Sequence, residues 1–206
     1  GAETTGWSRL RMKGKPGQKV VISYPGSGSH TFGRYQACEY YFKSDDWETY
    51  APRFMYGGYR TIEVSGLDYE PALTDLVSEV VSTDLEHTGS FAASDERFNQ
   101  MQEIMVRTLR KYVMHIPADP TREKAGWTQD VHSNFWSFGY NTMAAAVWAN
   151  WQRDFIDAVQ ANGYMPPVVP SRFDGPDING PWWGGAVIYG PWYMYEFYGD
   201  KEILAE

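Results

Sequence analysis

The chain has 206 residues, with 26 acidic and 18 basic side chains and a formal charge of −8 at neutral pH. This acidic balance argues against nucleic acid or an anionic membrane surface as a partner, because both require clustered Lys and Arg. No run of 18 or more apolar residues is present, so the sequence predicts no membrane-spanning helix. Cys38 is the single cysteine, which excludes an internal disulfide and a CxxC metal site.

Aromatic residues are abundant: nine Trp, fifteen Tyr and ten Phe make up 17% of the chain. Many of them can pack a core. Indole and phenol rings also form the platforms on which sugar rings stack while polar neighbours bind the hydroxyls. The composition therefore favours a carbohydrate protein.

The first ninety residues have the period-two alternation of half-buried strands. Leu10 and Met12, for example, alternate with Arg9 and Arg11, and Pro/Gly turns separate the apolar segments. Several short strands bounded by such turns predict a jelly-roll-like β-sandwich. We expect strands at 7–12, 20–24, 35–42, 59–64 and 73–83. Four large aromatics in this region are interpreted as a packed core, with a sugar-binding surface as the alternative: Trp7, Tyr40, Trp47 and Tyr59.

The period changes to that of a helix near residue 94. Ser94 is a suitable N-cap, and an apolar stripe with three- and four-residue spacing then continues to about Met114. Further helices are expected at 130–150, 151–161 and 186–198. The sequence thus predicts a β-sandwich domain at 1–90 and a helical domain at 91–206, with the boundary between Leu85 and Ser94.

Two long loops, 116–130 and 163–185, connect these helices and are rich in Trp, Pro, Asp and Gly. We expect them to gather at one end of the helices and to form a pocket. Within the first loop, the segment 119–130 carries three carboxylates, one guanidinium and one indole, and Pro120 and Gly126 oppose a continuous helix. The alternative is a surface loop in which Arg122, Glu123 and Lys124 neutralise one another.

Several motifs, in this order and roughly this spacing, resemble the bacterial α-L-rhamnosidases. Arg122-Glu123 followed by Gly126-Trp127-Thr128-x-Asp130 is the specific one. The others are Thr5–Arg11, Ala51–Arg60, Pro117–Asp119, Tyr164–Pro170, Trp183–Ala186, Gly190–Trp192 and Tyr198–Asp200. The resemblance implies an inverting glycoside hydrolase with an (α/α)6 barrel preceded by β-sandwich domains.

The resemblance also implies residue roles. Glu123 matches the general acid, and Trp127 matches an aromatic of the rhamnose subsite. Trp182 or Trp183 matches a second aromatic. Three polar residues match groups that bind the sugar hydroxyls: Asp119, Arg122 and Asp130.

Three departures from the family pattern bear on these roles. Asp119 precedes Glu123 by four residues, where the family commonly has six. Trp183-Gly184-Gly185-Ala186 lacks the usual Asp. The family's general base and further barrel helices lie beyond residue 206, so the chain is interpreted as the N-terminal portion of a longer enzyme, with the remaining C-terminal part as its partner.

The expected substrate is a rhamnose-containing glycoside or oligosaccharide, with no cofactor, nucleic acid or membrane partner. The four histidines lack the paired spacing of a zinc site, so no metal is predicted. Two other functions remain open: a non-catalytic carbohydrate-binding protein and an inactive fragment. Aglycone and linkage preference, oligomeric state and compartment (bacterial cytoplasm, or periplasm or exterior after removal of a signal) also remain open.

Overall fold

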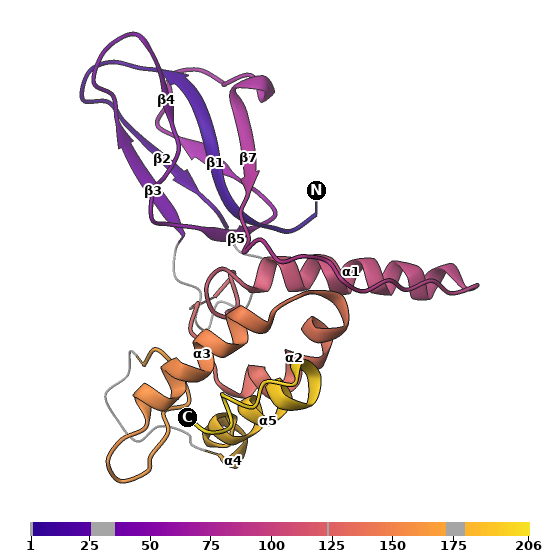
Figure 1. Cartoon of the computed structure of the whole chain (residues 1–206). Coiled ribbons are helices and arrows are strands. Elements are labelled where there is room, and N and C mark those ends of the chain that lie inside the picture. Colours follow the sequence, from indigo (N-terminus) through magenta and orange to yellow (C-terminus); the bar gives the residue numbers. More distant parts are fainter. Residues whose placement is uncertain (1, 26–35, 123, 172–179) are drawn as a thin grey trace. The chain divides into compact units, whose positions relative to one another are not determined.

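The computed structural model describes residues 2–25, 36–122, 124–171 and 180–206 (Figure 1). The chain divides into two compact units. The strand unit comprises residues 1–82 together with 119–124, and the helical unit comprises 83–118 together with 125–206. Strands therefore precede helices along the chain, as the change of hydrophobic period predicted.

The strand unit contains two antiparallel sheets. In one, β1 (Thr4–Lys13) pairs with β4 (Trp47–Tyr50), β5 (Gly57–Tyr59) and β7 (Leu76–Val80), and a 3-10 turn at Leu73–Asp75 precedes β7. In the other, β2 (Lys19–Ser23) lies between β3 (Ala37–Tyr41) and β6 (Glu63–Ser65). Buried residues of both sheets form one core: Leu10, Met12, Val20, Ile22, Tyr24, Phe42 and Tyr59.

The prediction of a single strand at 59–64 was wrong. Gly57–Tyr59 pairs with β1, whereas Glu63–Ser65 pairs with β2 in the other sheet, so the chain changes sheets at 60–62. Strand β4 was not predicted either. Its Trp47 and Thr49 are exposed, and its Glu48 binds the Tyr40 hydroxyl, so β4 lacks the apolar alternation on which the prediction relied.

The helical unit consists of α1 (Glu96–Tyr112), α2 (Gln129–Asn141), α3 (Ala145–Ala158), the short α4 (Pro181–Gly184) and α5 (Ala186–Tyr198). Its core contains five large aromatic side chains that are almost fully buried: Phe135, Phe138, Trp148, Trp151 and Phe155. The predicted bounds of the last helix, 186–198, are confirmed. Within the described ranges, no helix is both long and apolar enough to cross a bilayer.

Two details of the helix prediction were wrong. The N-cap of α1 is Asp95, whose carboxylate accepts a hydrogen bond from the Arg97 amide, and not Ser94. Two helices were predicted at 130–150 and 151–161, with the break between them at 150–151. The break between α2 and α3 lies instead at 142–144. Thr142 has extended backbone angles and forms a β-bridge with His87, so a contact distant in sequence ends α2.

Candidate active site

The first part of the predicted site, 119–124, belongs to the strand unit and is attached to β5. The amide of Gly58 donates a 2.9 Å hydrogen bond to the carbonyl of Pro120. A Cβ at Gly58 would lie 2.8 Å from the Pro120 carbonyl carbon and from Thr121 Cγ2, closer than normal packing permits. A glycine at this position therefore allows the loop to approach the strand.

Asp119 organises this loop. Its Oδ1 accepts hydrogen bonds from the Thr121 amide (2.8 Å) and hydroxyl (2.6 Å), and its Oδ2 accepts one from Arg122 Nε (2.7 Å). Partial burial pushes the pKa of Asp119 upward, but the hydrogen bonds and the Arg122 charge outweigh burial and bring the pKa below its ordinary value. Asp119 is therefore an ionised hydrogen-bond acceptor at neutral pH.

Lys124 lies against the strand unit with left-handed backbone geometry, at φ 55°. Its ammonium donates a 3.1 Å hydrogen bond to Gln36 Oε1 and lies 5.3 Å from the centroid of the Tyr56 ring. Burial lowers the pKa of Lys124, and the nearby Asp119 charge opposes that shift. Glu123, the predicted general acid, lies outside the residues that the structure describes.

The second part of the predicted site, 125–130, belongs to the helical unit and pairs with the segment 167–169. The Val169 amide donates to the Gly126 carbonyl (2.8 Å), and the Thr128 amide donates to the Pro167 carbonyl (2.9 Å). A Cβ at Gly126 would lie 2.2 Å from the Val169 carbonyl oxygen. In the described residues, the two long loops are therefore in contact, as predicted.

Thr128 links three segments and was not singled out in the sequence. It is fully buried, and its hydroxyl lies 3.1 Å from the Pro167 carbonyl oxygen and 2.9 Å from that of Trp183. These contacts fix the backbone of α4 next to the loop that carries Trp127. The sequence feature that could have indicated this role of Thr128 is its position inside the Gly-Trp-Thr-x-Asp motif.

Asp130 lies in the first turn of α2, where the helix dipole favours a negative charge. The Tyr112 hydroxyl donates a 2.6 Å hydrogen bond to Asp130 Oδ1. Tyr112 ends α1, and the sequence pattern assigned it only to an apolar stripe. The hydrogen bond restricts the orientation of the Asp130 carboxylate.

Trp127, Trp182 and Trp183 differ in exposure. Trp127 and Trp183 are partly buried, whereas half of the Trp182 surface is exposed. The indole of Trp182 packs beside His132 of α2 and Tyr189 of α5. Trp127, Asp130, Trp182 and Trp183 thus all belong to the helical unit, where Thr128 links the loop of Trp127 to the backbone of Trp183, while Asp119 and Arg122 bind each other in the strand unit.

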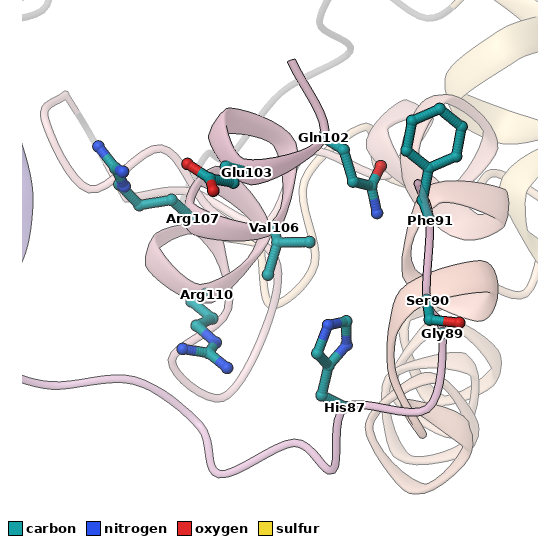
Figure 2. Close-up of a pocket in the computed structure, with 9 residues that line it drawn as sticks. All are labelled: His87, Gly89, Ser90, Phe91, Gln102, Glu103, Val106, Arg107 and Arg110. Atoms are coloured by element: carbon teal, nitrogen blue, oxygen red, sulfur yellow. The ribbon is translucent and has the colours of Figure 1, made fainter. Parts of the chain in front are cut away.

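The helical unit also contains a groove of about 590 Å³ between the segment 87–91 and α1 (Figure 2). Its walls are joined through Asn141, which interacts with His87 and Gln102. None of the predicted site residues lines this groove, and its described lining includes Phe91 but no Trp or Tyr. Across the described residues, no group of three or more His, Cys, Asp or Glu is arranged to bind a metal ion.

The family model for the bacterial α-L-rhamnosidase six-hairpin glycosidase domain matches residues 86–206. The chain belongs to this family. An α-L-rhamnosidase of Formosa agariphila is 31% identical over the whole chain. Among solved structures, the α-L-rhamnosidase of Dictyoglumus thermophilum has a TM-score of 0.87 at 27% identity. That of Streptomyces avermitilis, complexed with L-rhamnose, has a TM-score of 0.83 at 27% identity.

These relatives are much longer than the chain. It spans 24% of the Formosa agariphila protein, 24% of the Dictyoglumus thermophilum chain and 21% of the Streptomyces avermitilis chain. The two structural matches each cover 98% of the present chain. The similarity therefore extends over both units of this chain, and over about a quarter of the rhamnosidases compared with it.

Proposed function

We propose that the protein is a glycosidase that releases terminal α-L-rhamnose from glycosides or polysaccharides by single-displacement, inverting hydrolysis. The observation that carries the proposal is the family match across the helical unit, which includes the segment Gly126-Trp127-Thr128-Gln129-Asp130. A solved relative complexed with L-rhamnose supports the sugar specificity. The proposed substrate is a rhamnose-containing glycoside or oligosaccharide.

The proposal includes the finer architecture. Residues 1–90 would form a jelly-roll-like β-sandwich domain, and residues 91–206 the first helices of an (α/α)6 barrel. The remaining helices and the general base would come from a part of the protein beyond residue 206. The family's six-hairpin description and the greater length of the relatives support this arrangement.

Inverting hydrolysis uses a protonated carboxylic acid at the glycosidic oxygen and a carboxylate base on the opposite face of the sugar, about 6.5–9.5 Å away. Glu123 is proposed as the acid. The neighbouring Asp119 is not suited to that role, because its hydrogen bonds favour the ionised form. An ionised Asp119 suits the binding of sugar hydroxyls instead, since a carboxylate accepts several hydrogen bonds.

The other proposed roles follow from residue chemistry. Asp130 accepts hydrogen bonds from sugar hydroxyls, with its orientation fixed by Tyr112. Arg122 donates to the sugar while its Nε remains bound to Asp119. Trp127, Trp182 and Trp183 provide apolar surfaces for the sugar ring and for the methyl group of a 6-deoxy sugar.

The test is Glu123→Gln in the full-length gene product, assayed with an aryl α-L-rhamnoside. Loss of the general acid is expected to lower kcat by about 10³-fold while the melting temperature is kept. Glu103→Gln, an exposed carboxylate on α1, is the matched control and is expected to leave kcat unchanged. Near-normal turnover by the Glu123 variant would refute the assignment.

Product stereochemistry tests the mechanism separately. Proton NMR during the first turnovers should show β-L-rhamnose before mutarotation, because a single displacement inverts the anomeric carbon. Initial release of α-L-rhamnose would contradict the inverting mechanism. Binding of L-rhamnose without hydrolysis of any aryl glycoside would favour a non-catalytic carbohydrate-binding protein instead.

A further inference from the structure

His132 of α2 is surrounded by rings from two other elements. The centroid of its imidazole lies 5.1 Å from that of Trp182 on α4, and 5.4 Å and 5.8 Å from those of Tyr189 and Tyr193 on α5. The interplanar angles are 38°, 45° and 27°. Tyr189 and Tyr193 are themselves stacked, at 19°. The four rings pack together across three helices, with Tyr193 stacked on both His132 and Tyr189 and with Trp182 and Tyr189 tilted against His132, and we call this group the His132 stack.

A hydrogen bond fixes the imidazole in this stack. The Tyr193 hydroxyl lies 2.5 Å from His132 Nδ1, and either atom can be the donor. The centroid of the Tyr193 ring lies 5.3 Å from that of Phe135 and 5.4 Å from that of Trp136. Tyr193 is therefore packed against the core of the helical unit. The orientation of the His132 ring is therefore set by packing and by a directional bond together.

Trp182 depends on this support. It lies on a helix of four residues, and half of its surface is exposed. Among the described residues, the Trp182 ring contacts His132 and Tyr189, at centroid distances of 5.1 and 6.4 Å. An exposed indole that was free to rotate would lose conformational entropy on binding a ligand, whereas one packed against fixed rings has already lost much of it.

We propose that His132 is a positioning residue that, with Tyr193, holds Trp182 as a fixed platform for the sugar ring of the bound glycoside. This inference rests on the proposed function and adds residues that the sequence motifs do not contain. A platform contributes to substrate and transition-state binding alike, so its loss is expected to raise KM and to leave kcat nearly unchanged.

The experiment is a double-mutant cycle on His132→Ala and Trp182→Ala in the full-length gene product, with an aryl α-L-rhamnoside as substrate. Each single variant is expected to raise KM by about three- to tenfold, with kcat within about twofold. The double variant is expected to match Trp182→Ala alone, because His132 acts through the indole. His132→Phe, which keeps a ring in the stack, is expected to recover most of the wild-type KM.

Tyr193→Phe isolates the hydrogen bond, since it keeps the ring and removes the hydroxyl; a smaller rise in KM is expected. If His132→Ala does not fold, Tyr193→Phe takes its place in the cycle. Additive effects in the double variant, or a fall in kcat without a rise in KM, would overturn the inference while the proposed function stands. A wild-type protein that neither hydrolyses the aryl rhamnoside nor binds L-rhamnose would overturn both.

Discussion

Asp119 illustrates how local hydrogen bonds assign a role to a carboxylate. Its two oxygens accept three hydrogen bonds within the loop, two from Thr121 and one from Arg122. These bonds stabilise the charged form more than partial burial destabilises it, and the pKa lies below its ordinary value. The same bonds hold the loop in its conformation beside β5.

We expect Asp119→Asn to destabilise the strand unit by about 1–2 kcal/mol at pH 7, because an amide cannot accept on both positions of the carboxylate. An ordinary Asp titrates near pH 3.9, and the folded-state pKa of Asp119 is lower. The stabilisation by the ionised Asp119 is therefore complete above the ordinary pKa of an unfolded Asp, and it is lost as the pH falls through the lower folded-state pKa. Urea unfolding between pH 7 and pH 3 measures the effect.

The difference between wild type and Asp119→Asn should accordingly shrink at acidic pH. Asp45→Asn, at an exposed position of the same unit, is the control and should change the free energy of unfolding little at pH 7. If the free energy of unfolding of wild type exceeded that of Asp119→Asn by more at acidic pH than at pH 7, the lowered pKa of Asp119 would be contradicted.

At the scale of elements, close backbone approaches determine how the loops of the helical unit pack. Gly126 lies against the Val169 carbonyl, at the point where the segments 126–128 and 167–169 exchange hydrogen bonds. The indole of Trp151 on α3 donates a 2.9 Å hydrogen bond to the same carbonyl. The loop that bears Trp127 is thus attached to the core through a position without space for a side chain.

We expect Gly126→Ala to destabilise the helical unit by about 1–3 kcal/mol, because the new Cβ would overlap backbone atoms that can move only by separating the segments. Gly180→Ala is the matched control: its Cβ would meet only the Trp183 ring, at an ordinary 3.5 Å, and its φ of −86° suits any residue. Thermal unfolding of the two variants tests the contrast. Equal melting temperatures would contradict the packing argument.

At the scale of the whole molecule, one flank of α1 exposes several large apolar side chains. The exposed fractions of Phe98, Met101, Ile104 and Met105 are 53%, 63%, 60% and 42%. Exposed apolar side chains grouped on one helix flank favour association in water. The 206-residue chain is therefore expected to self-associate at high concentration.

We expect the pair Met101→Gln and Ile104→Gln to reduce this self-association, because Gln removes apolar surface and retains good helix propensity. Sedimentation velocity across a concentration series measures the change. The control pair, Glu103→Gln and Arg107→Gln, alters two exposed polar residues that line the groove of Figure 2 and should not reduce association. If the two pairs of substitutions changed self-association equally, the apolar flank of α1 would not be its cause.

The sequence by itself determined the order of strands and helices, the approximate bounds of α5, and the family. Those features depend on local periodicity and on a motif of neighbouring residues, and both are present in the chain before it folds. The predicted contact between the two long loops is also confirmed among the described residues. The roles of Glu123, Asp119, Arg122, Trp127, Asp130, Trp182 and Trp183 stay predictions.

Only the tertiary structure decided the features that depend on partners distant in the sequence. Thr142 ends α2 because it pairs with His87, and residues 60–62 change sheets because β1 and β2 provide separate partners. In the same way, Tyr112 orients Asp130, and Tyr193 orients His132 beside Trp182. A hydrogen bond between residues so far apart depends on the packed positions of whole elements, which local sequence patterns do not encode.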